Sequence, residues 1–123
     1  MAHATPSYPP IAGKNGGDGH FEVHIFLGPL NPGDEDVARY RAAVADFNAT
    51  NGADMKACLL ELMFRGRRGS GELQPVRVMQ SAMYVRAASV QDAIAAGYEH
   101  AAFFSMRGLE LLRIKVEASI HGL

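Results

Sequence analysis

Two segments near the ends of this chain alternate between polar and apolar residues, and they constrain its fold more than any other feature. Residues 20–26 are HFEVHIF and residues 111–117 are LLRIKVE. Successive side chains of a β-strand point to opposite faces, so a period of two is typical of strands with one buried face. The polar faces then hold His20, Glu22 and His24 in the first strand and Arg113, Lys115 and Glu117 in the last.

Two helices are predicted between these strands. The first follows the acidic segment 34–36, because the helix dipole favours negative charge at a helix start, and it ends at Gly52. The second begins at Ser89, which can cap it together with Asp92, and it ends at Gly108. The residues at helical spacing expected to be buried are Val37, Tyr40, Val44 and Phe47 in the first helix and Val90, Ile94, Gly97, Ala101 and Phe104 in the second.

Apolar runs at 55–64 and 76–85 predict two further strands, with a glycine- and arginine-rich hairpin tip at 65–71, and the last strand is predicted to span 109–120. The order strand, helix, strand, strand, helix, strand is that of an α+β, ferredoxin-like split βαβ sandwich (βαββαβ). Right-handed crossovers then give an antiparallel sheet in the order 4-1-3-2, with both helices on one face. The first and last strands are therefore expected to be neighbours.

The composition fits one globular domain, because 48% of the 123 residues are hydrophobic and 20% are charged. The segment 1–19 is rich in Pro and Gly and predicts an arm before a single domain at 20–123. A net charge of -1 offers no field that would attract nucleic acid or an anionic membrane. The single cysteine, Cys58, excludes an intrachain disulfide, and no signal peptide is visible, so a cytoplasmic protein is expected.

Helices on one face would leave the other face of the sheet open. The side chains expected to point toward the helices are Phe21, Val23, Ile25, Ile114, Val116 and Ala118. The polar residues of the first and last strands, here called the polar row, would then lie on the open face together with Phe26. The polar row consists of His20, Glu22, His24, Arg113, Lys115 and Glu117. In the second strand, the charged Glu61 suggests that its alternation partners also lie there, namely Ala57, Leu59 and Met63.

In the third strand, either of two sets of alternating residues could lie on the open face. One consists of Val78, Gln80, Ala82 and Tyr84, and the other of Met79, Ser81 and Met83. Either one makes half of the open face apolar. Monomers rarely leave a large apolar patch in water, so a homo-oligomer that covers this face is predicted.

The polar row has two interpretations. Opposite charges on neighbouring strands stabilise strand pairing, so the row can be a structural ladder of ion pairs. If the face instead encloses a pocket, Glu22 or Glu117 can serve as a general base and His24 as an acid or base. Arg113 or Lys115 would hold an anion there, with His20 as a further ligand-binding residue.

Other kinds of site are disfavoured by the residues present. His20, His24, Glu22 and Glu117 could bind a metal, but Arg113 and Lys115 beside them would repel a cation, so no metal and no cofactor are expected. An RNA-binding sheet needs stacked aromatic residues, and here only Phe26 and Tyr84 qualify. His100 follows Glu99 on the second helix and is interpreted as a surface histidine. Cys58 lies in an apolar run and is interpreted as a buried, inert thiol.

The pattern Phe21-Glu22-x-His24 near the start, with Arg113-x-Lys115-x-Glu117 near the end, resembles a group of uncharacterised bacterial ferredoxin-like proteins. Their first strand carries Phe/Tyr-Glu-x-His, and the resemblance implies no activity. The layout is also similar to dimeric α+β barrel proteins, which include small-molecule monooxygenases, isomerases and ligand-binding modules. Because activity is set by the site, this similarity implies the fold more than the function.

The sequence therefore predicts an oligomeric protein that binds a small anionic ligand or a partner on its open sheet face. The alternative is a small cofactor-free enzyme that works by acid/base chemistry through Glu22, His24, Lys115 and Glu117. A nucleic-acid-binding module is the third choice.

Overall fold

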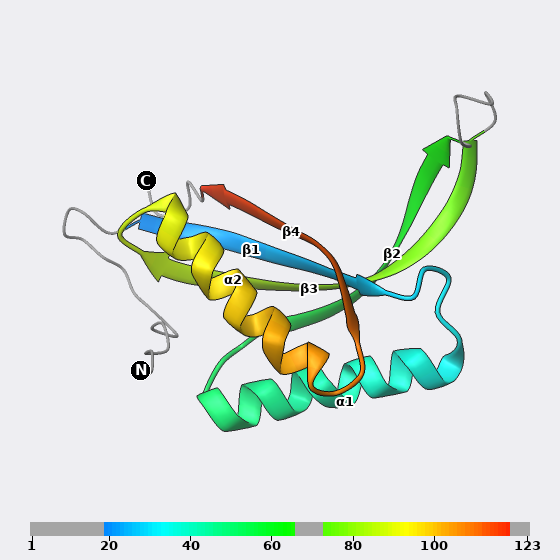
Figure 1. Cartoon of the computed structure of the whole chain (residues 1–123), viewed down its shortest axis with the longest axis horizontal. Coiled ribbons are helices and arrows are strands. Elements are labelled where there is room, and N and C mark those ends of the chain that lie inside the picture. Colours follow the sequence, from blue (N-terminus) through cyan, green and yellow to red (C-terminus); the bar gives the residue numbers. More distant parts are fainter. Residues whose placement is uncertain (1–18, 66–72, 119–123) are drawn as a thin grey trace.

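The computed structural model describes residues 19–65 and 73–118, and this part of the chain contains four strands and two helices (Figure 1). Their bounds are β1 Gly19–Gly28, α1 Asp34–Asn51, β2 Lys56–Arg65, β3 Leu73–Ala87, α2 Val90–Ser105 and β4 Glu110–Ala118. Gly19, which we placed in the arm, is the first residue of β1. Arg65, which we placed in the hairpin tip, is the last residue of β2, and the rest of the predicted arm and tip lies outside the described residues.

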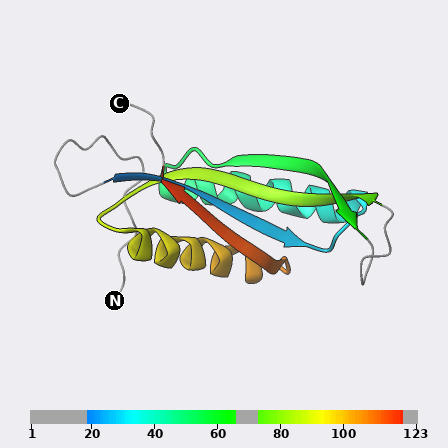
Figure 2. The same cartoon turned by 90° about the horizontal axis from the view of Figure 1, so that it is seen from above.

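The strands form one antiparallel sheet in the order β2-β3-β1-β4, which is the predicted order counted from the other edge. Both helices cover the same face of this sheet, with α2 packed on β4 and β1 and α1 beneath β2 and β3 (Figures 1 and 2). The predicted pairing of the first and last strands is confirmed. This arrangement is consistent with a ferredoxin-like fold.

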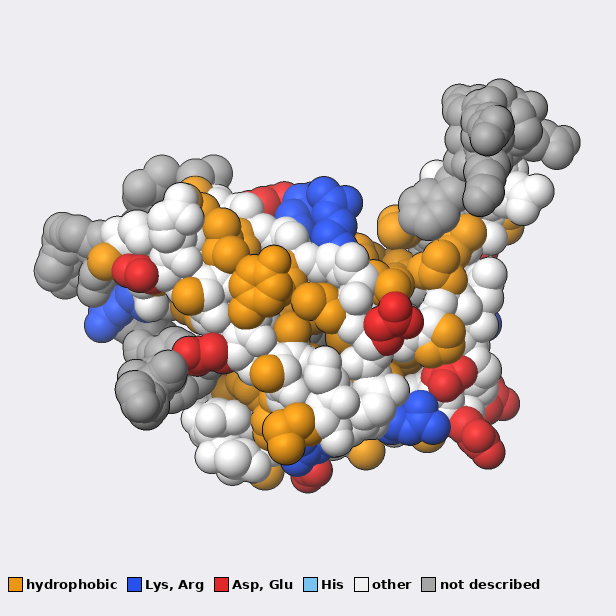
Figure 3. Space-filling view, viewed as in Figure 1, with side chains coloured by type: hydrophobic (Ala, Val, Ile, Leu, Met, Phe, Trp, Pro, Cys, Tyr) orange, Lys and Arg blue, Asp and Glu red, His pale blue; other side chains and the backbone are white. Residues whose placement is uncertain are grey.

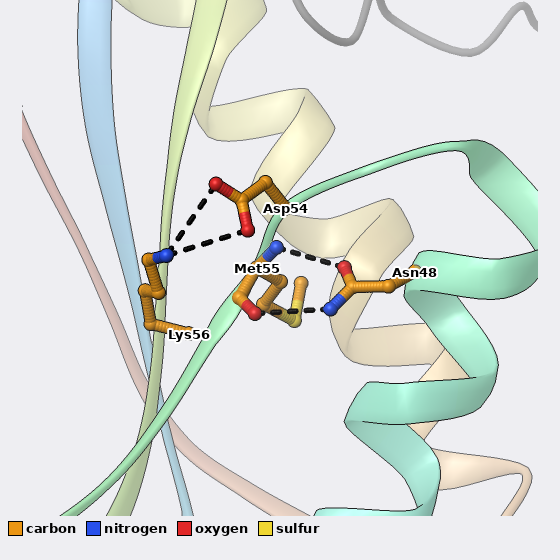
Figure 4. A network of polar contacts seen from close by, with 4 residues as sticks. All are labelled: Asn48, Asp54, Met55 and Lys56. Atoms are coloured by element: carbon orange, nitrogen blue, oxygen red, sulfur yellow. Dashed lines mark hydrogen bonds and ion pairs between the residues drawn. The ribbon is translucent and has the colours of Figure 1, made fainter.

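The helix ends confirm the signals in the sequence. The Ser89 hydroxyl accepts a hydrogen bond from the backbone N–H of Asp92 at 3.1 Å, as a helix cap does. Helix α1 has an acidic first turn and is followed by Gly52 at a φ of 60°, in the left-handed region that favours glycine. The connection from α1 to β2 is fixed by Asn48, whose side chain bonds the backbone N–H and C=O of Met55 at 2.8 and 3.0 Å (Figure 4).

The core lies between the helices and the sheet. The predicted stripe of α1 is confirmed, with Tyr40, Val44 and Phe47 buried and Val37 packed against them. From the strands, Val23 and Ile25 are fully buried and Ile114 and Val116 pack against the core, also as predicted. Ala118, at the end of β4, is exposed.

The buried face of α2 differs from the predicted one. Gly97, Ala101 and Phe104 are buried as expected, but Val90 is 42% exposed. Ile94 is only partly buried, and Ala93, Ala96 and His100 are buried instead. The helix turns this side to the sheet because small residues allow close packing: a Cβ atom at Gly97 would lie 3.0 Å from Ile114 and 3.2 Å from Val23.

The interpretation of His100 as a surface histidine is wrong. Its side chain is 1% exposed and packs edge-on against Phe47, with ring centroids 5.0 Å apart. It lies one helical turn from both Gly97 and Phe104, which places it on the buried face of α2. Burial lowers the pKa of His100 to about 4, because the low-dielectric interior penalises its charged form.

Candidate functional site

The strand register assigns side chains to the open face, because residues directly opposite each other share a face. Of the two alternations considered for β3, the one on the open face is Val78, Gln80, Ala82 and Tyr84, whereas Met79 and Met83 belong to the core. On β2, Cys58 lies opposite Gln80 and Leu60 lies opposite Val78. The open face of β2 therefore holds Lys56, Cys58, Leu60 and Leu62.

The prediction that Ala57, Leu59 and Met63 lie on the open face is wrong. Leu59 packs against the helix-side core, and Glu61 shares its face. Glu61 is charged and exposed there because the far end of β2 rises away from the helices (Figure 1). A polar residue on the helix side of β2 thus has water around it, and its charge does not mark the open face. The interpretation of Cys58 as a buried thiol is also wrong, because Cys58 lies on the open face and is only partly buried.

The bend of β2 and β3 makes the open face concave and creates a groove of about 720 Å³. Most of its lining is apolar and consists of Phe26, Leu30, Leu60, Leu62, Val78 and Leu112. The polar part of the lining consists of His24, Gln80, Arg113 and Lys115. Figure 3 shows Lys and Arg side chains beside hydrophobic ones at the upper edge, facing the raised end of β2 and β3.

The groove has a buried floor and an exposed rim. Val78 and Gln80 in the floor are 2% and 7% exposed, whereas Leu30 and Leu112 at the rim are 45% and 42% exposed. The floor residues belong to β3, which lies between β2 and β1 in the sheet. A ligand in the groove would therefore contact mainly aliphatic side chains.

The polar residues of β1 and β4 lie side by side because the two strands are neighbours, as predicted, and the structure adds their register. Glu22 lies opposite Glu117, His24 opposite Lys115 and Phe26 opposite Arg113. The Lys115 ammonium lies 3.0 Å from the Glu117 carboxylate, and this hydrogen bond and charge hold the pKa of Glu117 below its usual value.

Three members of the row line the groove. Lys115 and His24 contribute side chains there, and the guanidinium carbon of Arg113 lies 5.9 Å from the Phe26 ring centre. Glu22 and Glu117 belong to the same row but do not line the groove. His20 lies opposite Arg86, beyond Glu22 along β1, and is also outside the groove lining.

His24 connects the row to the groove floor. Its Nε2 atom lies 3.7 Å from the Glu22 carboxylate, and its Nδ1 atom lies 3.4 Å from the Gln80 side-chain nitrogen. On the other side of Glu22, desolvation and the Glu22 carboxylate raise the pKa of Tyr84. Tyr84, Glu22, His24 and Gln80 thus form a chain of polar neighbours from the surface to the floor.

Gln80 was not predicted as a site residue because the sequence leaves the register of β3 open. The backbone C=O of Gln80 accepts a hydrogen bond from the Tyr40 hydroxyl, which also accepts one from the Cys58 N–H at 3.0 Å. Tyr40 thus bridges β2 and β3 where Gln80 enters the floor. Desolvation by burial raises the pKa of Tyr40 well above its ordinary value. No signal in a single sequence marks such a contact between a helix and two strand backbones.

The described part of the chain contains no group of three or more His, Cys, Asp or Glu side chains that could hold a metal ion. Within residues 19–65 and 73–118, no helix has the length and apolar character needed to cross a membrane.

Comparisons with protein-family models, curated proteins and solved structures found no match to this chain. The resemblance to uncharacterised ferredoxin-like proteins therefore stays a prediction, and function has to be argued from the groove alone.

Proposed function

We propose that this protein binds a small amphipathic anion, a carboxylate with an aliphatic body, in the groove of its open sheet face. The observation that supports this proposal is a groove of about 720 Å³ in which aliphatic side chains face two cationic ones, Arg113 and Lys115. Ligand pockets commonly have volumes of about 300 to 1,000 Å³ and combine an apolar lining with a few polar groups.

The apolar part of the groove would supply most of the affinity. Each CH₂ group removed from water contributes about 0.8 kcal/mol, so a chain of about eight carbons can offset the entropy lost on binding. Leu60, Leu62 and Val78 offer such a chain a continuous aliphatic surface across β2 and β3. The cationic wall on β4 then orients the chain.

Arg113 is the better of the two anion-binding side chains. Lys115 is engaged with Glu117 at 3.0 Å, and a ligand would have to compete with that carboxylate. A guanidinium offers two parallel donors that match a carboxylate, and its position beside the Phe26 ring restricts its orientation. We therefore expect Arg113 to dominate recognition of the charged end.

The proposal includes self-association, because Leu30 and Leu112 at the groove rim and Tyr84 on the open face of β3 are all more than two-fifths exposed. A second copy placed over the open face would cover such side chains and close the groove. Light scattering at micromolar concentration should give at least twice the monomer mass of 13.2 kDa. A monomer at that concentration would contradict this part of the proposal and leave ligand binding to be judged separately.

Displacement of a fluorescent dye tests ligand binding directly. Anilinonaphthalene sulfonate combines an apolar body with an anionic group, and the absence of Trp from the chain keeps the protein background low. Decanoate should displace the dye, and Arg113→Gln should weaken decanoate binding about tenfold, the loss of one charge-assisted hydrogen bond. The matched control Arg41→Gln, on the exposed side of α1, should leave binding unchanged. Equal effects of the two variants would refute the proposed anion site.

Acid/base catalysis is the second candidate, and the contact between Glu22 and His24 favours it. A carboxylate 3.7 Å from Nε2 can orient the ring, while the ring itself lines the groove. Lys115 and Glu117 would complete the set. Exchange of hydrogen for deuterium beside the ketone of γ-oxodecanoate, followed by NMR, should be accelerated by the wild type and lost in His24→Gln. A wild-type rate equal to the buffer rate for this bound ligand would remove this candidate.

A further inference from the structure

We infer that the anion bound in the groove carries a second polar group on its chain, a hydroxyl or carbonyl oxygen near the carboxylate, and that Gln80 recognises it. This inference rests on the proposed function and adds the class of ligand, an oxygenated medium-chain carboxylate. It also assigns a specificity role to a residue that sequence analysis did not single out.

The geometry places Gln80 close to the anion site. Phe26 on β1 lies directly opposite both Gln80 on β3 and Arg113 on β4, so the three residues form one row across the sheet. Neighbouring strands are about 4.8 Å apart, so the Cα atoms of Gln80 and Arg113 are separated by roughly 10 Å. A carboxylate held at Arg113 would lead its chain over the Phe26 ring to Gln80 within a few carbon atoms.

The environment of Gln80 gives the inference its physical basis. The side chain is 7% exposed and lies in the floor next to aliphatic residues of the groove. A primary amide has two donors and an oxygen with two acceptor sites, and the 3.4 Å contact with His24 accounts for one nitrogen position. Water can serve the rest while the groove is open.

A ligand with an alkyl chain would change how the Gln80 amide is hydrogen-bonded. An alkyl segment that covers the floor expels water, and a buried amide then loses hydrogen bonds that hydrocarbon cannot replace. A ligand oxygen at this point restores them. Sites built to hydrogen-bond a polar group discriminate strongly against analogues that lack it.

Gln80 is also held in place more firmly than a surface glutamine. Its backbone is tied to the Tyr40 hydroxyl, and its amide is positioned by His24. Folding alone would favour an apolar side chain at so buried a position. We therefore assign Gln80 to ligand recognition and His24 to positioning its amide.

The test compares three ligands of equal chain length, namely decanoate, β-hydroxydecanoate and δ-hydroxydecanoate, by displacement of anilinonaphthalene sulfonate. In the wild type, at least one hydroxylated isomer should bind about tenfold more tightly than decanoate. Gln80→Met keeps the length of the side chain and removes its polar atoms, so it should abolish this preference while still binding decanoate. The control Gln91→Met, at an exposed position of α2, should keep the preference.

The outcomes separate this inference from the function on which it rests. If decanoate binds and neither hydroxylated isomer binds more tightly, the inference is overturned and the proposed function stands. If the preference survives in Gln80→Met, Gln80 is not the recognising residue and the inference is also overturned. If none of the three ligands binds, the proposed function itself fails. The comparison of ligands in the wild type needs no variant. If Gln80→Met does not fold, Gln80→Asn takes its place: it withdraws the amide by one carbon and should reduce the preference for the hydroxylated ligand.

Discussion

The two faces of this sheet satisfy their polar groups in opposite ways. On the helix-covered side, Tyr40 is 1% exposed and its hydroxyl bonds the backbones of two strands. On the open side, Lys115 and Glu117 pair with each other while 43% and 46% exposed. Hydrogen bonds count for more where water is excluded, so stability should depend on the first set, whereas the second set is available for ligand chemistry.

The largest effect is expected for Tyr40→Phe. This change leaves the Cys58 N–H and the Gln80 C=O without their shared partner in a buried place, which should lower the free energy of unfolding by about 3 kcal/mol. Urea unfolding followed by circular dichroism measures it. Tyr98→Phe, at a site 59% exposed, is the matched control and should change little. Equal stabilities of the two variants would contradict the view that buried hydrogen bonds on the helix-covered face stabilise the fold.

His100 should make stability depend on pH. Its pKa is lowered to about 4 in the folded state, below the ordinary value of 6.5, so the unfolded chain binds the extra proton first. The stabilisation is complete above the unfolded pKa and is lost as pH falls toward the folded one. Between about pH 7.5 and about pH 5 the loss should be about 2 kcal/mol.

The variant His100→Leu isolates this contribution. It replaces the ring with an apolar side chain that cannot titrate, so its unfolding free energy should fall less steeply over the same pH interval. Parallel pH profiles for the wild type and His100→Leu would show that the buried histidine does not control acid stability.

A smaller loss is expected for Gly97→Ala, beneath β1 and β4. The new methyl group would lie 3.0 Å from Ile114 and 3.2 Å from Val23, an overpacking that costs about 1 to 3 kcal/mol. The better helix propensity of alanine returns about 1 kcal/mol, so a net loss of about 1 kcal/mol should be measured by thermal unfolding. A gain in stability would mean that α2 can move away from the sheet at no cost.

The smallest effect is expected on the open face. Glu117→Gln removes the partner of Lys115 from a pair that is nearly half exposed, so the free energy of unfolding should change by at most about 0.5 kcal/mol. Glu110→Gln, also exposed on β4, serves as the control. A loss as large as that of Tyr40→Phe would show that the polar row is a structural ladder, contrary to the contrast drawn above.

Much of the fold was predictable because its signals are local. The alternation of β1 and β4, the cap at Ser89 and the stop at Gly52 each depend on a few neighbouring residues, and all are confirmed. The stripe of α1 was predictable for the same reason, since large apolar residues at helical spacing mark the buried side. In α2, Gly97, Ala101 and Phe104 were predicted correctly, but Ala93 and Ala96 are too small to mark the buried side and were missed.

The groove was less predictable because it depends on register and curvature. Glu61 misled the assignment of β2, since a strand that bends away from the helices exposes both of its faces. Arg113, Lys115 and His24 were found because they alternate in sequence, whereas Gln80 needed the pairing of β3 with β1. Alternation in the sequence shows which face of its strand a side chain lies on. Its neighbours on adjacent strands are known only from the pairing of the strands in the sheet.

The position of β4 as an edge strand of the sheet has a further consequence. A strand with one neighbour offers its outer backbone N–H and C=O groups to other chains, and charged side chains hinder such pairing between molecules. Arg113, Lys115 and Glu117 supply those charges along β4. Variants that neutralise these charges would remove this protection of the edge strand, so aggregation should be monitored whenever these three positions are changed.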